Sequence, residues 1–513
     1  QATDETTVEE LLRARVETIR AGEGTRIGAA TIASVNVLPA LYERRGFRLL
    51  WSSQAAVDDL LRAIRGSERH GLDPADYHLV EIERRRGQTP DAAARVDLDL
   101  LLTDATIRLA YHLRFGKVDP EVLDPSWNFT SQLDVRDPAT ALLQVIEEGN
   151  VSDALDRLAP QLPFYRNLMT TLAEYRRIRD AGGWNPVPDG PTLKPEMQDA
   201  RMPALRRRLA VTGDLPADEA ADTTDRYAPA LVAAVKIFQE RHGLTADGNV
   251  GATTVRALDV PVGQRIEQLR ATLERCRWVM HDLAERFVLV NVAGFQVYLV
   301  ERGAPIWESP VVVGTTYTKT PIFRADMTYV VLNPTWTVPP GILRKEVVPG
   351  MQRDPGYLAR KGYAQVNGQI VQPAGPRNAL GRIKLIFPNP HSVYLHDTPS
   401  KSFFNETSRT FSHGCVRVAK PFELAALALN DPAWSTEALL AAADKGKTRT
   451  ISLARSIPVL ILYWTAAVGR DGRTYFLPDV YGRDPAIVRG LNSAFRFRKR
   501  PLISAPASTP SGL

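Results

Sequence analysis

Cysteine is scarce in this chain, which holds two cysteines, Cys276 and Cys415, among 513 residues. The chain also lacks a CxxC pair and an HExxH helix, so a zinc site built from His396, His413 and Cys415 has no obvious fourth ligand. We therefore expect no metal and no cofactor. We expect no disulfide either, because a nucleophilic cysteine must stay free, and Cys276 is interpreted as a packed structural thiol.

Long apolar runs and a strong net charge are absent as well. No stretch of eighteen or more apolar residues occurs, which argues against a membrane span. The net charge is +6 and the basic residues are dispersed, so no nucleic-acid partner is expected. The chain begins with Gln1 and not Met, and we expect that an export signal or anchor preceded this numbering.

A short segment around Cys415 places this rare residue beside histidine and glycine. The segment reads Phe411-Ser412-His413-Gly414-Cys415-Val416-Arg417-Val418, and sixteen residues separate His396 from His413. A thiol has a pKa of about 8.5, so it becomes a useful nucleophile near neutral pH only beside a base or a positive charge. His396 and His413 are candidate bases, and Gly414 lets backbone amides approach an oxyanion. The segment indicates a cysteine nucleophile, while a buried structural cysteine stays an open alternative from these residues alone.

Together with residues 393–400, this segment resembles the catalytic signature of bacterial L,D-transpeptidases, the YkuD-type domain. Arg417 stands where many members have Asn, a departure typical of the large periplasmic subgroup called YcbB-like. Three further stretches resemble the same subgroup, namely 333–340, 372–381 and 408–411. The resemblance is strong over residues 285 to 480.

The resemblance implies a double displacement on the tetrapeptide stem of peptidoglycan. Cys415 would attack the carbonyl of the diamino acid, His396 would take the thiol proton, and terminal D-alanine would leave. An amine of a neighbouring stem would then resolve the thioester into a 3→3 cross-link. The backbone carbonyl of Asp397, and not its carboxylate, is expected to orient His396.

Further site residues follow from the same resemblance. Tyr394 and the amides of Gly414 and Cys415 are expected to stabilise the oxyanion, and His413 to order the motif or to bind substrate. Substrate-side or supporting roles are expected for Trp336, Asn378, Ser412 and Arg417. Core packing stays an equal alternative for Trp336, and an internal ion pair stays an alternative for Arg417.

The chain is expected to be a multidomain α+β protein. Residues 1–190 resemble a helical scaffold domain, and Leu98, Leu102, Ala105, Leu109 and Leu113 recur at helical spacing within it. Helices are predicted at 57–65, 92–115 and 139–158. The Pro- and Gly-rich stretch 184–195 is interpreted as a linker.

Residues 196–260 contain the phrase AVKIFQERHGLTADGNVGATTVRAL, which resembles the peptidoglycan-binding type 1 domain. From periodicity alone, a generic three-helix bundle explains the phrase equally well. Gly243 is placed to end the first helix of the phrase. Phe238, Gln239 and His242 are expected to be structural and not to contact a ligand.

Residues 264–483 are expected to form a mainly β catalytic domain, sandwich-like in the family. Alternating segments at 287–292, 296–301 and 305–313 are joined at 293–294 and 302–303, which predicts hairpins. Residues of about 338–388 interrupt this pattern with helical segments, and the resemblance implies a capping subdomain over the active site. Residues 484–513 are expected to be a flexible C-terminal tail.

The function predicted is an L,D-transpeptidase of the periplasm that acts on peptidoglycan stem peptides and is acylated by carbapenems. Membrane association is expected only through a preceding N-terminal segment, and other wall-synthesis proteins are candidate partners. An L,D-carboxypeptidase, a lipoprotein-anchoring transpeptidase and a non-catalytic wall-binding scaffold remain open. A papain-like or NlpC-type peptidase is disfavoured, because those enzymes usually place the cysteine before the histidine, opposite to His396 and Cys415.

Overall fold

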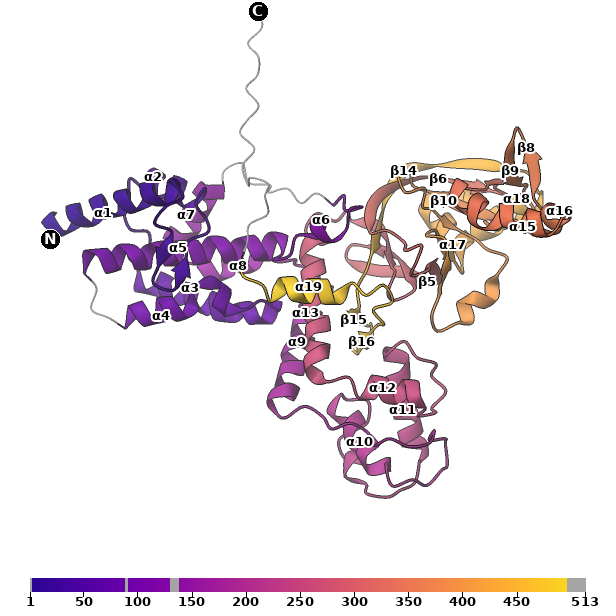
Figure 1. Ribbon diagram of the computed structural model, residues 1–513, viewed down its shortest axis with the longest axis horizontal. Coiled ribbons are helices and arrows are strands. Elements are labelled where there is room, and N and C mark those ends of the chain that lie inside the picture. Colours follow the sequence, from indigo (N-terminus) through magenta and orange to yellow (C-terminus); the bar gives the residue numbers. More distant parts are fainter. Residues whose placement is uncertain (1, 88–90, 130–137, 496–513) are drawn as a thin grey trace, which may run out of the picture.

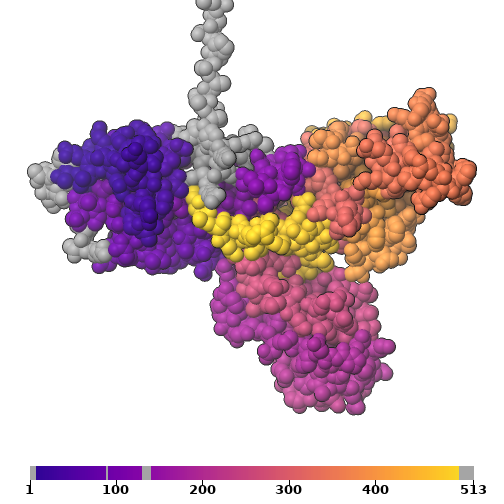
Figure 2. All heavy atoms as spheres, viewed as in Figure 1, coloured from indigo at the N-terminus to yellow at the C-terminus, as the bar shows by residue number. Residues whose placement is uncertain are grey.

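A computed structural model of the chain describes residues 2–87, 91–129 and 138–495. Three lobes are visible in Figure 1: a helical lobe at the N-terminal end, a mainly β lobe, and a small helical module below them. Figure 2 shows the C-terminal helix, in yellow, lying along the junction between the first two lobes. Of the predicted tail 484–513, residues 496–513 lie outside the described residues.

The helical lobe is built around one long buried helix, α5 (Ala92–Phe115). Its bounds match the predicted helix 92–115. The other helices of the lobe are α1 (Ala2–Arg20), α2 (Leu38–Arg44), α3 (Gln54–Gly66), α4 (Leu79–Arg86), α6 (Pro120–Leu123), α7 (Pro138–Glu148), α8 (Val151–Leu158) and α9 (Pro163–Asp180), and a two-residue ladder joins β1 (Arg26–Ile27) to β2 (Ala30–Thr31). The single helix predicted at 139–158 is wrong, since Gly149 adopts a positive φ of 73° and separates α7 from α8.

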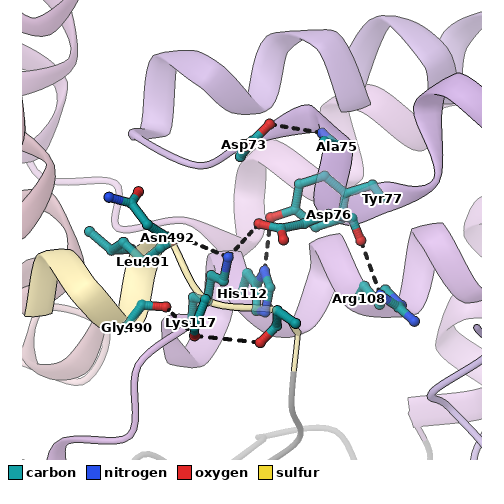
Figure 3. A network of polar contacts seen from close by, with 12 residues as sticks. Asp73, Ala75, Asp76, Tyr77, Arg108, His112, Lys117, Gly490, Leu491 and Asn492 are labelled. Atoms are coloured by element: carbon teal, nitrogen blue, oxygen red, sulfur yellow. Dashed lines mark hydrogen bonds and ion pairs between the residues drawn. The ribbon is translucent and has the colours of Figure 1, made fainter.

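A buried polar network ties the C-terminal helix to the helical lobe (Figure 3). The Lys117 ammonium donates to Asp76 Oδ2 at 2.6 Å and to the carbonyl of Leu491 at 2.7 Å. Tyr77 and His112 share a hydrogen bond of 2.8 Å in the same network. Lys117 is satisfied only when the C-terminal helix lies against the helical lobe. The network therefore holds the chain that follows the β lobe against that lobe.

The expected start of the tail is corrected by α19 (Asp484–Leu491). Pro485 stands in its first turn, and Ile487 and Leu491, four residues apart, are both buried. One apolar face therefore packs against α13 (Val262–Val279). Sequence composition after residue 496 suggested a tail, but the first eight residues of the predicted tail are an ordered helix.

Helix α13 joins the helical lobe to the β lobe. It packs against α5, α9 and α19, although the sequence assigned it to the catalytic domain alone. Glu274 and Arg277 form a fully buried ion pair on it at 2.5 Å, and Glu274 also accepts from the Val118 amide at 2.6 Å. One continuous apolar cluster runs from the helical lobe through α13 into the sheet. The two lobes therefore share a core.

The small module has its own core and consists of α10 (Met202–Val211), α11 (Pro229–Arg241) and α12 (Ala252–Leu258). As predicted, α11 ends before Gly243, whose φ is 65°. The predicted linker is not free chain, because Val187 and Leu193 are buried in this core and Leu193 pairs with Val250. Gln239 and His242 are buried and hydrogen-bonded inside the module, in the structural role predicted for them.

The β lobe is a nine-stranded sheet that closes on itself. The strand order is β12-β5-β13-β11-β10-β6-β14-β3-β4, and a further pairing of β4 with β5 completes the ring. The strands are β3 (Arg286–Asn291), β4 (Gln296–Glu301), β5 (Ala304–Gly314), β6 (Phe323–Leu332), β10 (Ile383–Ile386), β11 (Leu395–His396), β12 (Thr410–Ser412), β13 (Val416–Val418) and β14 (Arg449–Leu462). Both predicted hairpins are present, and Arg302 and Gly303 take the positive φ values that a tight hairpin turn needs.

Two helices and a second hairpin complete this lobe. Helices α17 (Pro421–Leu429) and α18 (Thr436–Asp444) pack beside the sheet, and β15 (Ala466–Val468) pairs with β16 (Thr474–Phe476). The small module docks on this hairpin, where Arg241 donates to the Thr474 carbonyl at 2.9 Å and the rings of His242 and Phe476 stack. The module is therefore held beside the β lobe.

The capping segment forms a separate small unit at the end of the β lobe (Figure 1). It contains β7 (Trp336–Thr337), α14 (Pro340–Ile342), the π-helical turn η4 (Leu343–Val347), α15 (Val348–Arg353), α16 (Tyr357–Lys361), β8 (Ala364–Val366) and β9 (Gln369–Gln372). Val338, Val347 and Ile370 form its own apolar cluster, apart from the main core. A unit with a separate core can change position without disrupting the sheet.

Candidate active site

Strand register brings the candidate residues to one face of the sheet. His396 on β11 pairs with Lys384 on the antiparallel β10 and with Arg417 on the parallel β13. The Val416 amide donates to the Tyr394 carbonyl at 3.1 Å, which extends the same pairing by one residue. Because side chains alternate along a strand, Tyr394, His396, Cys415 and Arg417 face the same side. The residues between them, such as Leu395 and Val416, are buried on the other side.

The turn that carries Cys415 is held by side-chain hydrogen bonds. The Ser412 hydroxyl donates to the Cys415 carbonyl at 2.5 Å and accepts from the Gly414 amide at 3.1 Å. Gly414 has a φ of 113°, a conformation that favours glycine. Thr320 supports the turn by donating to the Gly414 carbonyl at 3.0 Å. The backbone conformation at Gly414 thus presents Cys415 at the surface of the sheet.

These bonds correct two predictions. The Gly414 amide is engaged by Ser412, so it is not a free donor for an oxyanion in this conformation. Ser412 is buried and its hydroxyl is used within the turn, so it orders the motif and does not face substrate. Tyr394 and the Cys415 amide remain as the oxyanion donors predicted from the sequence.

The thiol of Cys415 contacts Ser392 and Tyr394. Its sulfur lies 3.6 Å from the Ser392 carbonyl, and the Tyr394 side chain lies beside it. Tyr394 in turn lies beside the half-buried indole of Trp336. Burial raises the pKa of the Cys415 thiol, and the charges of Arg417 and Lys384 only partly oppose this. The thiol is therefore protonated at neutral pH.

His396 is buried and held in one orientation. Its Nδ1 lies 2.5 Å from the carbonyl oxygen of Asp397, the contact expected from the sequence. Nδ1 then carries the proton of the neutral ring and Nε2 carries the lone pair. Burial, with the nearby charge of Arg417, lowers the pKa of His396 to about 4. His396 is thus a neutral base at neutral pH.

In this conformation Cys415 and His396 are neighbours on the sheet but are not hydrogen-bonded. Among the contacts of the described residues, the sulfur of Cys415 meets Ser392 and Tyr394 and not the imidazole. The two side chains must therefore come into hydrogen-bond contact before a proton can pass to His396. Catalytic hydrogen bonds commonly tighten only when substrate is bound.

The carboxylate of Asp397 points away from His396. It accepts from the Arg382 amide at 2.9 Å and from the Lys401 ammonium at 2.5 Å. A Cβ on Gly381 would lie 2.4 Å from this carboxylate, so the loop needs glycine there. The geometry therefore excludes Asp397 from a carboxylate triad, as the sequence predicted, and leaves its carbonyl as the orienting group.

His413 and Asn378 connect the site to the capping segment. His413 is exposed, and its Nε2 lies 2.5 Å from Glu346 Oε1 in η4. Asn378 is buried and donates to the carbonyls of Pro334, Gln372 and Pro373. Its amide is used up in holding the base of the segment, so its predicted place in the substrate-binding set is corrected to a structural one. Trp336 packs on the capping cluster while its indole reaches Tyr394.

Three residues near the site were missed in the sequence analysis. Ser392 has a φ of 54° and turns its carbonyl to Cys415, Lys384 pairs with His396, and Glu346 reaches His413. No sequence pattern marks Ser392 or Glu346. Alternation in 383–386 marks one face for Lys384, but only the strand register shows which residues share that face. Among the described residues, no group of three or more His, Cys, Asp or Glu side chains could hold a metal ion.

Comparison with protein families gives three matches along the chain. Residues 36–172 match a scaffold domain, residues 198–258 the "Putative peptidoglycan binding domain", and residues 285–451 the L,D-transpeptidase catalytic domain named YkuD. The last range contains both His396 and Cys415. These matches fall on the helical lobe, the small module and the β lobe, and they are consistent with the YcbB-like subgroup.

A curated relative and several solved structures are also similar. The relative, "Putative L,D-transpeptidase" of Haemophilus influenzae, is 31% identical over 220 residues, which is 39% of this chain and 45% of the relative's length. An L,D-transpeptidase from Mycobacterium smegmatis is 13% identical over 35% of this chain and 59% of its own, with a TM-score of 0.20. One from Xylanimonas cellulosilytica is 17% identical over 54% of this chain and 99% of its own, with a TM-score of 0.18.

Proposed function

From the L,D-transpeptidase catalytic domain and the peptidoglycan-binding domain that this chain carries, we propose that it forms 3→3 cross-links in peptidoglycan through a thioester on Cys415. The observation that supports this most is the placement of Cys415 and of the buried, neutral imidazole of His396 on one face of the sheet. Such a pair performs general-base-assisted attack and does not rest as a thiolate–imidazolium ion pair.

In the first half-reaction, His396 Nε2 takes the thiol proton as the sulfur attacks the carbonyl of the diamino acid. The negative charge that develops on the carbonyl oxygen is stabilised by the Tyr394 hydroxyl and the Cys415 amide. The C–N bond then breaks, and His396 returns the proton to the amine of D-alanine as it leaves. A thioester and neutral His396 remain, so the proton balance is closed.

In the second half-reaction, an amine of a neighbouring stem attacks the thioester. His396 takes the proton that the amine loses on forming the new amide bond, and this proton returns to the sulfur as the C–S bond breaks. Water in place of the amine would give hydrolysis. The capping segment, which reaches the catalytic turn through Glu346 and His413, supports a role in excluding water from the thioester.

The proposal places the protein on the cell wall, in the periplasm. The peptidoglycan-binding domain matches the module that docks on the β15–β16 hairpin, so it would hold the polymer near the catalytic lobe. No helix among the described residues combines the length and the apolar character needed to cross a membrane.

Product analysis by mass spectrometry tests the proposal. The protein and its Cys415→Ala variant are each incubated with purified disaccharide-tetrapeptide. Cysteine-dependent dimers that have lost one D-alanine are expected. Cysteine-dependent tripeptide alone would make the protein an L,D-carboxypeptidase, and adducts with a lipoprotein acceptor but not with stems would make it an anchoring enzyme. Unchanged substrate with both proteins would favour a wall-binding scaffold.

A carbapenem offers an independent test of the nucleophile. Its strained ring presents an activated carbonyl, so we expect a stable acyl adduct whose mass equals the intact drug. Intact-mass analysis should find the adduct on the protein and not on Cys415→Ala, while Cys276 stays unmodified because it is fully buried. An adduct of equal yield on Cys415→Ala would contradict the assignment of Cys415.

A further inference from the structure

Two cations beside Cys415 have no carboxylate partner. Lys384 and Arg417 flank His396 in the strand register, one on each neighbouring strand. Both are half-buried, and neither forms an ion pair with any residue that the structure describes. Each cation lies near an aromatic ring. Lys384 Nζ is 5.6 Å from the centroid of the Tyr394 ring, and the Arg417 guanidinium is 5.8 Å from the centroid of the Phe403 ring. Arg417 Nε is buried without a hydrogen-bond partner.

Several other buried guanidinium groups are paired with carboxylates, whereas Arg208 and Arg265 donate to the carbonyls of Leu258 and Ala257. Arg277 pairs with Glu274, Arg241 with Asp214, and Arg275 with Asp484. A desolvated cation costs stability unless an anion or hydrogen-bond acceptors compensate it. Desolvation accordingly lowers the pKa of both Lys384 and Arg417. An unmatched pair of cations at a reactive thiol calls for a partner from outside the protein.

The carboxylate next to His396 in sequence is already bonded to other residues. Asp397 follows His396 directly, but its oxygens are held by the Arg382 amide and Lys401. Glu346, the other carboxylate that reaches the catalytic turn, is bonded to His413. A carboxylate of the substrate is therefore a suitable partner for the two cations. In a tetrapeptide donor, the terminal carboxylate belongs to the residue bonded to the scissile carbonyl, so it lies within one residue of the atom that Cys415 attacks.

We propose that Lys384 and Arg417 form a subsite for the terminal carboxylate of the donor stem, and that this subsite makes the enzyme select stems whose leaving residue is the last one. The inference rests on the proposed function. A guanidinium and an ammonium group together bind a carboxylate through charge-assisted hydrogen bonds. A stem that ends in an amide, or that continues by another residue, would leave both cations desolvated and unpaired.

Binding to the inactive Cys415→Ala protein tests the subsite without chemistry. Isothermal titration compares the disaccharide-tetrapeptide with the same compound carrying a C-terminal carboxamide. We expect the carboxamide to bind at least about tenfold more weakly, since hydrogen bonds to charged groups are lost. Adding Lys384→Gln or Arg417→Gln should weaken binding of the acid about tenfold and leave the carboxamide unchanged. Equal binding of acid and carboxamide, or no binding of either, would overturn the proposal.

Two control variants test whether the preference for the acid depends on the charges of Lys384 and Arg417 and not on the loss of any nearby cation. Arg382→Gln removes a nearby cation that is already paired with Asp444, so it should not change the preference for the acid. Arg417→Lys keeps the charge and should retain part of the preference. Because the two subsite cations are unpaired, Lys384→Gln and Arg417→Gln should not lower the Tm. A lowered Tm would mean that they have structural partners and would count against the subsite.

Turnover by the unmodified protein, measured in parallel, keeps the two proposals apart. Cysteine-dependent products with equal binding of acid and carboxamide would retain the transpeptidase and reject the subsite. Preferential binding of the acid without any cysteine-dependent product would retain the subsite and reject the transpeptidase.

Discussion

At the scale of single residues, burial decides the chemistry of the nucleophile and its base. Burial raises the pKa of Cys415 and lowers that of His396 to about 4, and these shifts act against an ion pair between them. The thiolate forms only as the attack proceeds. The protonated thiol is less reactive in the absence of substrate. The same low reactivity protects Cys415 from other electrophiles.

The pH dependence of alkylation follows from these shifts. With iodoacetamide, a neutral reagent, the rate at Cys415 should rise only at alkaline pH, because the raised pKa keeps the thiol protonated below it. Arg417→Gln removes a charge that lowers this pKa, so the rise should move to higher pH. The measurement is the alkylation rate by peptide mass spectrometry. A plateau between about pH 5 and 8 would instead indicate a preformed thiolate–imidazolium pair.

Gly314, at the end of β5, has no room for a larger side chain. A Cβ there would lie 2.0 Å from the Thr318 carbonyl and 3.1 Å from the Cα of Gly414. Gly314→Ala should lower stability by about 1–3 kcal/mol, the usual cost of overpacking, and should also slow acylation of Cys415. Thermal unfolding measures the first effect. Gly341→Ala is the matched control, since nothing lies within 4 Å of a Cβ at that position, and an equal effect of both changes would contradict the explanation.

The contact between His396 and the carbonyl of Asp397 was expected from the resemblance and is present, since the two residues are adjacent in sequence. The roles of Cys415 as nucleophile and His396 as base stay predictions. Lys384 and Ser392 could not be found in this way. Their place beside Cys415 depends on the pairing of β10 with β11 and on the positive φ of Ser392, and neither has a sequence signal. Substrate-side or supporting roles were expected for Asn378 and Ser412 from the resemblance, and their internal hydrogen bonds favour the supporting role.

At the scale of elements, the capping segment meets the catalytic turn through Glu346 and His413. Both side chains are about half exposed, so the bond is open to solvent and weaker than a buried one. Glu346 lies in a π-helical turn, and such turns occur frequently at functional sites. The contact is therefore suited to form and break as substrate enters.

Loosening this contact should be measurable. Glu346→Gln replaces the carboxylate by an amide, so we expect faster amide hydrogen exchange in the capping segment, chiefly in β8 and β9, with no change in β14. We also expect a larger share of hydrolysis relative to cross-linking, because water reaches the thioester more often. Glu437→Gln, on the exposed face of α18, is a control of the same chemistry. Unchanged exchange in β8 and β9 would show that Glu346 does not hold the segment.

Elements with strong periodicity were the most predictable ones. Helix α5 has the expected bounds and the hairpin strands begin and end within one residue of them, because apolar spacing and turn residues agree there. The helix at 484–491 was missed because it is short and its apolar face makes sense only against α13. The break at Gly149 was missed because a single glycine is tolerated in many helices.

At the scale of the whole molecule, the helical lobe and the catalytic lobe behave as one body around α13. The buried pair of Glu274 and Arg277 lies where the two lobes meet. Arg277→Met should lower stability by about 3–5 kcal/mol, because it leaves the Glu274 carboxylate buried without its partner. Glu274→Gln combined with Arg277→Met should recover part of the loss. Calorimetry that shows separate unfolding of the two lobes, with only one affected, would contradict a shared core.

The central claim is that Cys415 carries the acyl group of the donor stem. The direct measurement is acid-quenched peptide mapping after brief mixing of the protein with disaccharide-tetrapeptide and no acceptor. The account predicts a mass increase on the peptide containing Cys415 equal to the donor minus D-alanine, lost on treatment with hydroxylamine and absent in His396→Gln. Product formation without this adduct, or an adduct on another residue, would contradict it.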